Sequence, residues 1–375
     1  MRICFIAGAR PNFMKVAALI EACETHNKEH DENGKEFNDI EYTLIHTGQH
    51  YDDKMSQVFF DELGLPHPDY NLEVGGKNAE EQKREIKEKL AKIFREQKFD
   101  VVAVVGDVTS TLAGAEAAKA AGISVAHVEA GLRSFNNKMS EEHNRTETDK
   151  IADYLFASEP DGLKNLEEEK VKGKKYLVGN VMIDTLKRFL PLAEEKSYIL
   201  NALKLKSDNF ILITLHRAEN LGKNLGMALR VLESASKDLP VIFPIHPRTK
   251  KEIITAWGKQ GWEERKQRLN FIEPLSYIDF LQLMKNAKFV LTDSGGIQEE
   301  TTILGVPCLT LRNETERPIT VEKGTNEIVG LDEQKIKESI EKIMQGKWKH
   351  SREIENWDGH AAERIIEILH KELSK

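Results

Sequence analysis

The sequence predicts an α/β protein made of two doubly wound, Rossmann-like domains that face a cleft. Short β-branched runs alternate with amphipathic helical stretches, and this alternation begins a second time after residue 185. Strands that are apolar at successive positions are typical of parallel sheets covered by helices on both faces. Two series of similar size indicate two domains, because 375 residues exceed one ordinary hydrophobic core.

The first series contains the strands of a predicted N-terminal domain, residues 1–185. Helical segments, among them 77–98 and 109–121, separate these strands, and the charge-dense segment 27–41 is expected to be a surface insertion or loop. The predicted strands are RICFIAG (2–8), YTLIHTG (42–48), DVVAVVGD (100–107), ISVAHVEAG (123–131), YLFAS (154–158) and KYLVGN (175–180).

The second series belongs to a predicted C-terminal domain, residues 186–357, which follows a helical connection at 184–209. The amphipathic tail 358–375 is predicted to be a helix that packs back on the N-terminal domain. The predicted strands of the second domain are FILITLH (210–216), PVIFPIH (240–246), LNFIEPL (269–275), FVLTDSG (289–295) and VPCLTLR (306–312).

Composition and charge exclude several classes of protein. Lys+Arg 54 against Asp+Glu 62 give a net charge of −8, which disfavours general nucleic-acid binding. The three cysteines show no paired or metal-ligand spacing, so a reducing compartment is the simplest inference. No apolar run approaches the ~18 residues needed to span a bilayer, and the amino terminus does not read as a signal peptide. We therefore expect a cytoplasmic protein with no membrane segment.

Polar residues follow seven of the predicted strands. GAR, GQH, GD and EAG follow strands of the first series, and HR, HPR and DSGG follow strands of the second. Ligands of doubly wound sheets bind outside the carboxyl ends of the strands. Two such edges predict a cleft between the domains.

The segment LTDSGGIQEE predicts a seat for a diphosphate at the start of a helix. Asp293 or Ser294 is placed to cap the helix, and Gly295 and Gly296 let backbone N–H groups approach a ligand closely. A helix N-terminus favours phosphate, and Glu300 lies one turn further in, where it suits ribose hydroxyls. The alternative is an ordinary capped turn between strand and helix. No GxGxxG motif follows a strand, which argues against a classical dinucleotide fold.

Charged groups gather at the strand ends of the first domain. Arg10 and Lys15 stand at the head of the first helix, where two cations either share an anion or form a solvated pair. Asp107 and Glu129 end the third and fourth strands, and Glu141 and Glu142 precede Arg145 by four and three residues. Carboxylates on one edge suit acid–base catalysis if their pKa values are spread apart. The alternative interpretations are a helix cap for Asp107 and an i,i+4 ion pair for Glu141 and Arg145.

His216 and His246 end strands of the second domain, and two histidines facing a cleft favour ligand contact. Neither HxxxH nor HExxH spacing occurs, so no metal site is predicted. No GxSxG motif is present, which argues against a nucleophile elbow.

Eight motifs in order resemble those of the non-hydrolysing UDP-N-acetylglucosamine 2-epimerases: GARPNFMK, GDVTST, VEAGLRS, EEHNRTETD, HRAEN, HPR, TDSGGIQEE and LRNETERP. The resemblance extends from residue 1 to about residue 330. It implies a glycosyltransferase-B-like fold, a homodimer, no cofactor, and interconversion of UDP-GlcNAc and UDP-ManNAc. It further implies elimination of UDP to 2-acetamidoglucal, followed by re-addition after protonation of C2 from the opposite face.

The resemblance also assigns roles to residues. It implies that the catalytic residues are Asp107, Glu129, Glu141 and His216. It implies that substrate is bound by Arg10, Lys15, Arg145, Phe280 at the uracil, Ser294, Gly295, Gly296, Glu300 and Arg317. Two positions depart from the family pattern: Val108 replaces a usual Thr and Ser140 a usual Pro, and neither change removes a proposed catalytic group. An allosteric second UDP-GlcNAc site, known in many bacterial members, is compatible with Gln49, Arg217 and His246.

Three other functions compete with this interpretation. A hydrolysing 2-epimerase would release UDP and ManNAc, although VEAGLR and HRAEN favour the non-hydrolysing branch. A glycosyltransferase of the same fold would turn over only with an added acceptor. A nucleotide-sugar sensor would bind UDP-GlcNAc without exchanging the C2 proton.

Overall fold

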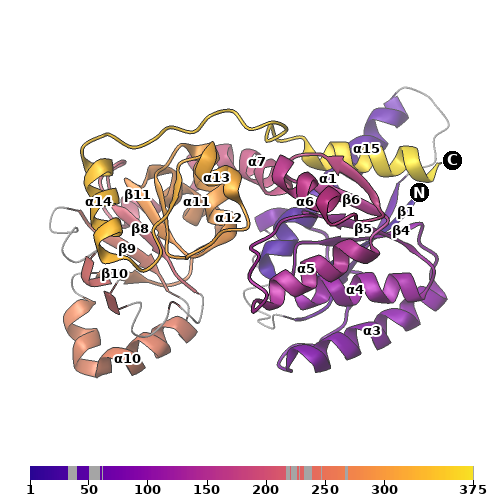
Figure 1. Cartoon of the computed structure of the whole chain (residues 1–375), viewed down its shortest axis with the longest axis horizontal. Coiled ribbons are helices and arrows are strands. Elements are labelled where there is room, and N and C mark those ends of the chain that lie inside the picture. The colour runs from indigo at the N-terminus through magenta and orange to yellow at the C-terminus, as the bar shows by residue number, and fades with distance from the viewer. Residues whose placement is uncertain are drawn as a thin grey trace. The chain divides into compact units, whose positions relative to one another are not determined.

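The computed structural model describes residues 1–32, 40–49, 60, 62–216, 220, 226–227, 229–231, 239–245, 247–266 and 269–374. The chain divides into two compact units, which we call unit 1 and unit 2 (Figure 1). Unit 1 comprises Met1–Leu186 and Glu355–Lys375, and unit 2 comprises Lys187–Ile354.

Unit 1 is built on a seven-stranded parallel sheet of order β3-β2-β1-β4-β5-β6-β7. The strands are β1 Arg2–Ala7, β2 Glu41–His46, β3 Tyr70–Asn71, β4 Val101–Val105, β5 Ser124–Val128, β6 Tyr154–Ala157 and β7 Lys174–Leu177. The helices are α1 Arg10–Glu32, α3 Ala79–Glu96, α4 Thr109–Ala120, α5 Ser140–Ile151, α6 Pro160–Glu168, α7 Val181–Lys196, which runs on into unit 2, and α15 Ala361–Leu373.

Burial on both faces explains the strands of unit 1. Every residue of β4 is buried, because α3, α4 and α5 cover one face of the sheet and α1 and α15 lie on the other (Figure 1). Helix α3 shows the matching pattern: Ile86 and Leu90 point into the core, and Asn78 caps the first turn by accepting from the N–H of Glu81.

Unit 2 repeats the design with a six-stranded parallel sheet of order β10-β9-β8-β11-β12-β13. The strands are β8 Ile211–Thr214, β9 Val241–Pro244, β10 Leu269–Ile272, β11 Phe289–Thr292, β12 Cys308–Thr310 and β13 Asn326–Ile328. The helices include α8 Ile199–Ala202, α10 Pro247–Arg265, α11 Tyr277–Asn286, α12 Gly295–Leu304, α13 Pro318–Glu322 and α14 Glu333–Met344. The predicted α/β class with two doubly wound parallel sheets is confirmed.

The strand order reverses at one point in each sheet, between β1 and β4 in unit 1 and between β8 and β11 in unit 2. In doubly wound sheets such a switch point is where loops diverge and a ligand binds. Four of the seven polar strand ends found in the sequence follow these strands: GAR after β1, GD after β4, HR after β8 and DSGG after β11. The fold therefore predicts that a ligand contacts the loops after these four strands.

The C-terminal helix α15 belongs to unit 1 and packs along α1 (Figure 1). Its apolar face, with Ile365 and Leu369 buried, explains the packing. Asp184 accepts a hydrogen bond from the N–H of Ala362 at 2.7 Å, so a carboxylate stands at the positive end of the helix. Trp357 donates its indole N–H to the carbonyl of Ser158 at 2.9 Å and anchors the preceding segment.

Two local expectations are corrected. Segment 27–41 is predicted to be a surface insertion or loop, whereas residues 27–32 continue helix α1. Asn27 also exchanges two hydrogen bonds with the backbone of Ile40, at 2.9 and 3.0 Å. Strands β3 and β13 escaped prediction because they have two and three residues and mix polar with apolar side chains.

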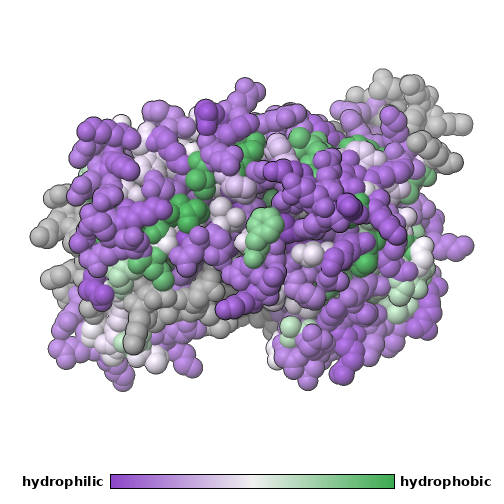
Figure 2. Space-filling model, viewed as in Figure 1, coloured by the Kyte–Doolittle hydropathy of each residue, from purple (hydrophilic) through white to green (hydrophobic). Residues whose placement is uncertain are grey.

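No helix in the described part of the chain is long and apolar enough to cross a membrane. The face in Figure 2 is mainly hydrophilic, with apolar residues in separate patches.

Candidate functional site

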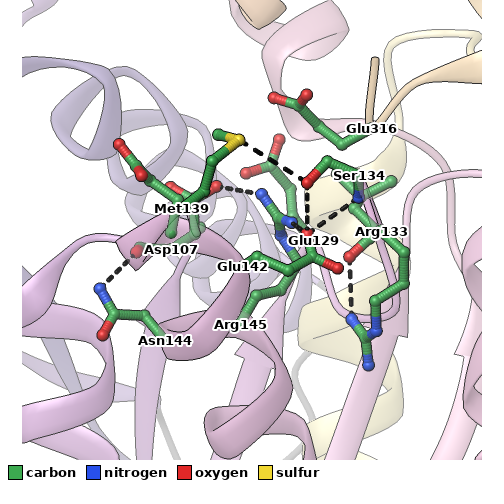
Figure 3. Close-up of polar contacts among 12 residues, drawn as sticks. Asp107, Glu129, Arg133, Ser134, Met139, Glu142, Asn144, Arg145 and Glu316 are labelled. Carbon is green, nitrogen blue, oxygen red and sulfur yellow. Dashed lines mark hydrogen bonds and ion pairs between the residues drawn. The ribbon is translucent and has the colours of Figure 1, made fainter. Parts of the chain in front are cut away.

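Arg145 on α5 joins two carboxylates at the edge of the unit 1 sheet (Figure 3). Its guanidinium donates to Asp107 Oδ2 at 2.5 Å and to Glu142 Oε2 at 2.8 Å. Arg145 is 1% exposed, whereas the side chain of Asp107 is 26% exposed. A buried cation therefore holds a carboxylate that solvent, and hence a ligand, can reach.

Glu142 is the carboxylate that fixes this arrangement from behind. It is buried and accepts hydrogen bonds from the N–H and hydroxyl of Ser134, both at 2.8 Å, and from the N–H of Phe135 at 3.2 Å. Figure 3 shows Ser134 and Arg145 on either side of it. Glu142 thus ties the loop after β5 to α5.

Both alternative interpretations of the unit 1 carboxylates are wrong. Val108 occupies the N-cap of α4, so Asp107 is not the cap residue. Arg145 pairs with Glu142 three residues before it and with Asp107, and Glu141 instead accepts from the hydroxyl of Ser140 at 3.1 Å.

Lys15 and Glu129 form a second buried ion pair in unit 1. Glu129 has φ of +69°, a left-handed conformation that costs energy in a residue other than glycine. Gly106 lies directly beside the pair: a Cβ there would be 3.4 Å from both Lys15 Nζ and Glu129 Oε2. Asn12 holds the loop after β1 by donating to the carbonyl of Val105 at 3.0 Å. Such strain at a charged, buried position is typical of a functional site.

In unit 2, Asp293 orients His216. The carboxylate is fully buried and accepts from the backbone N–H of His216 at 3.2 Å, while the imidazole Nδ1 lies 2.9 Å from Asp293 Oδ1. The amide of Asn220 donates to the other carboxylate oxygen at 2.9 Å. The side chain of His216 is 58% exposed, so the arrangement presents its Nε2 edge outward.

The start of α12 differs from the predicted capped turn. Ser294 occupies the N-cap, but its side chain forms no cap hydrogen bond, and the carboxylate of Asp293 serves His216 instead. The first turn also carries no acidic residue. Neither the Ser294 side chain nor an acidic residue of the first turn caps this helix. The carboxylate of Glu316 lies beside the helix start, since a Cβ on Gly295 would be 3.0 Å from Glu316 Oε1.

Arg317 lies against the same helix start. A Cβ on Gly295 would be 2.4 Å from Arg317 Nη1, so a larger residue there would force the guanidinium to move. Arg317 donates to Glu299 Oε1 at 2.5 Å and to Glu316 Oε1 at 2.7 Å, and all three side chains are buried. These charge-assisted bonds hold the guanidinium in one orientation.

Glu300 is buried on α12 and accepts a hydrogen bond from the hydroxyl of Tyr277 at 2.7 Å. Burial raises the pKa of Glu300 to about 7; the bond from Tyr277 opposes this rise and the nearby Glu299 adds to it. Glu300 therefore changes charge near neutral pH. Phe280, the residue predicted to contact the uracil, lies on α11 and is partly exposed.

Replacing Glu300 by Gln is expected to abolish a pH dependence of stability. Between pH 4.5 and about 7 the folded protein keeps the proton that the unfolded chain has lost. The free energy of unfolding of the wild type therefore falls as pH rises through this window, by on the order of 3 kcal/mol. Denaturant unfolding near pH 5 and pH 8 measures the difference. The same fall in the Gln variant would show that Glu300 is not its source.

The described candidate residues are divided between the two units. The unit 1 group is Lys15, Asp107, Glu129, Glu141 and Arg145, and the unit 2 group is His216, Phe280, Ser294, Gly295, Gly296, Glu300 and Arg317. The side chain of Arg10, and both Arg217 and His246, lie outside the described residues. Gln49 accepts from the N–H and hydroxyl of Ser110.

Sequence reasoning missed the supporting residues. Asn12, Tyr277, Glu299 and Glu316 hold the predicted groups in place, and Glu142 was noted without a role. Glu299 was visible next to Glu300, but nothing local revealed that it faces Arg317.

Comparison with known proteins finds a matching family and similar relatives. A family model described as UDP-N-acetylglucosamine 2-epimerase matches residues 32–370. A UDP-N-acetylglucosamine 2-epimerase of Methanocaldococcus jannaschii is 40% identical over 382 residues, covering 98% of this chain and 99% of the relative. A UDP-2,3-diacetamido-2,3-dideoxy-D-glucuronate 2-epimerase of Pseudomonas aeruginosa is 36% identical over 378 residues, covering 99% and 100%.

Two solved structures of UDP-GlcNAc 2-epimerases are similar to this chain over 99% of its length. The M. jannaschii UDP-GlcNAc 2-epimerase in complex with UDP-GlcNAc and UDP superposes with a TM-score of 0.87 at 39% identity, covering 99% of this chain and 100% of that one. The Neisseria meningitidis enzyme bound to UDP-GlcNAc gives 0.86 at 32% identity, with coverage of 99% and 100%. With the family model spanning most of the sequence and close relatives spanning nearly all of it, this chain belongs to the UDP-N-acetylglucosamine 2-epimerase family.

Proposed function

We propose that this protein interconverts UDP-GlcNAc and UDP-ManNAc without hydrolysis. The observation that carries the proposal is the pair of ion-paired carboxylates at the ends of adjacent strands. Val105 of β4 is in register with Val128 of β5, and Asp107 and Glu129 follow within two residues. Each is held by a buried cation, Arg145 or Lys15. Two carboxylates held at neighbouring strand ends suit removal of a proton and its return.

The proposed reaction has two half-steps. A base removes the C2 proton, the C1–O bond to UDP breaks, and its electron pair leaves on the diphosphate while a C1–C2 double bond forms. UDP stays bound beside the resulting 2-acetamidoglucal. A proton is then delivered to the opposite face of C2, and a diphosphate oxygen re-forms the bond to C1. Water is not consumed and no redox cofactor is needed.

The chain supplies a group for each demand of this reaction. We assign proton transfer and its support to Asp107, Glu129, Glu141 and His216. We assign the diphosphate to Arg10, Lys15, Arg145, Arg317 and the helix start at Ser294, Gly295 and Gly296. Glu300 is proposed to accept from the ribose hydroxyls and Phe280 to contact the uracil. A strong diphosphate seat is required because charge develops on the leaving oxygen. A homodimer remains a prediction from the resemblance, and a cytoplasmic location remains a prediction from the composition and the apolar runs of the sequence.

Incubation with UDP-GlcNAc in D₂O, followed by NMR of C2, tests the proposal. We expect deuterium at C2 of UDP-GlcNAc, formation of UDP-ManNAc, and no stoichiometric release of UDP. Release of UDP with free ManNAc would indicate a hydrolysing enzyme. Turnover that depends on an added acceptor would indicate a transferase, and binding without exchange a sensor.

A second nucleotide sugar belongs in the same experiment. The Pseudomonas relative is nearly as similar as the Methanocaldococcus one, and its name specifies UDP-2,3-diacetamido-2,3-dideoxy-D-glucuronate. We expect preference for UDP-GlcNAc, measured as the ratio of kcat/KM values. Turnover of the diacetamido sugar alone would move the substrate assignment while leaving C2 epimerisation in place.

A further inference from the structure

The side chain of His127, on β5, is completely buried beneath the unit 1 group. Its Nδ1 lies 2.6 Å from Asp149 Oδ1, and its Nε2 lies 2.8 Å from the carbonyl oxygen of Gly106. Asp149 comes from α5 and is also completely buried. Neither residue has a part in the reaction as proposed above.

Hydrogen-bond chemistry defines the state of this pair. A carbonyl oxygen only accepts, so Nε2 of His127 donates to Gly106. Burial by itself raises the pKa of Asp149, but His127 and Arg133 outweigh it, so the pKa lies below its ordinary value. The carboxylate is therefore ionised and Nδ1 donates to it. Each ring nitrogen of His127 thus has its own partner, Asp149 at Nδ1 and the carbonyl of Gly106 at Nε2.

The second oxygen of Asp149 extends the contact to another turn. It accepts from the backbone N–H of Gly131 at 3.1 Å and lies 2.7 Å from Arg133 Nη2. Arg133 in turn makes two bonds of 2.8 Å to Glu169, whose side chain is 34% exposed. Arg133 is thus paired with Asp149 inside the protein and with Glu169 as its outer partner.

The two backbone groups that the pair holds border the proposed catalytic carboxylates. Gly106, with φ of +69°, directly precedes Asp107, and Gly131, with φ of +82°, follows Glu129 by two residues. Glu129 itself has φ of +69°. Because Glu129 is not a glycine, its backbone stays in this region only where the surroundings enforce it. The buried pair of His127 and Asp149 contacts both turns and so restrains them together.

We propose that His127 and Asp149 are positioning residues that hold Asp107 and Glu129 in one relative geometry for proton transfer. The inference rests on the proposed function of those two carboxylates. His127 acts through the turn at Gly106, and Asp149 through the turn at Gly131. Because both are fully buried, neither contacts the substrate.

Two amide substitutions of His127 distinguish a positioning role from a packing role. In His127→Gln, the longer amide places a donor where Nε2 stands and keeps the bond to Gly106. In His127→Asn, the shorter amide reaches Asp149 but leaves the carbonyl of Gly106 without its donor. We expect His127→Asn to lower kcat on the order of 10- to 100-fold, and His127→Gln to recover much of this loss. Affinity for UDP should be unchanged in both.

Two further variants complete the comparison. Asp149→Asn preserves shape but removes the charge that His127 faces, so kcat should fall as in His127→Asn. Glu169→Gln alters only the outer contact of Arg133 and should keep the kcat of the wild type. C2 deuterium exchange, UDP calorimetry and thermal melts are measured on all four. If the histidine variants fail to fold, the kcat of Asp149→Asn tests the inference instead.

Equal kcat values for the wild type, His127→Asn and Asp149→Asn would overturn the inference. So would kcat losses of the same size in His127→Asn and His127→Gln, since a packing role does not distinguish the two amides. Failure of the proposed function looks different: the wild type would not exchange C2, or Asp107→Asn would exchange normally.

Discussion

Asp107→Asn and Glu141→Gln are each expected to reduce kcat by on the order of 10²–10⁴-fold, the range that general acid–base catalysis supplies. Both changes preserve shape and remove the ability to transfer a proton. Affinity for UDP-GlcNAc should stay within a few-fold, because the loss is confined to the transition state. C2 deuterium exchange and calorimetry measure the two quantities.

A matched control lies on the same helix as Glu141. The side chain of Glu147 is 40% exposed and pairs with Lys150 at 2.7 Å, so Glu147→Gln should keep full turnover and cost less than about 1 kcal/mol of unfolding free energy. Normal exchange by Asp107→Asn or Glu141→Gln, together with a lowered melting temperature, would show that the residue is structural.

Gly295→Ala is expected to weaken UDP binding by about 10- to 100-fold. The new Cβ would lie 2.4 Å from Arg317 Nη1 and 2.9 Å from its Cζ, so the guanidinium must move. Glu299 and Glu316 hold that guanidinium in place, and moving it misaligns a charge-assisted bond to phosphate worth roughly 1.5–3 kcal/mol. Calorimetry with UDP measures the loss.

Gly226→Ala is the control in unit 2. A Cβ there would meet Trp257 Nε1 at 3.5 Å, an ordinary contact. Alanine is also the better helix former by about 1 kcal/mol, so the helix itself gives no reason for Gly295→Ala to be harmful. Wild-type UDP affinity in Gly295→Ala would mean that Arg317 does not bind the diphosphate.

The sequence by itself determined the fold class and the edges where the candidate groups lie. Strands such as VVAVV (101–105) are apolar throughout because helices cover both faces of a parallel sheet, and that pattern is readable without coordinates. Parallel strands also place their carboxyl ends at one edge, so Asp107 and Glu129 could be assigned to a common site. The shortest strands, β3 and β13, carry too few residues for such a pattern.

Only the tertiary structure decided which groups pair. Local spacing offered Glu141 as the partner of Arg145, yet the buried guanidinium takes Glu142 and Asp107, because burial requires partners on every side and these come from different elements. Asp293 was expected to cap α12 and instead orients His216. The pKa of Glu300 near 7 arises from burial, a property of the packed unit that no sequence window contains. Residue types and their order along the chain follow from the sequence, whereas partners, burial and charge state depend on contacts between residues far apart in it.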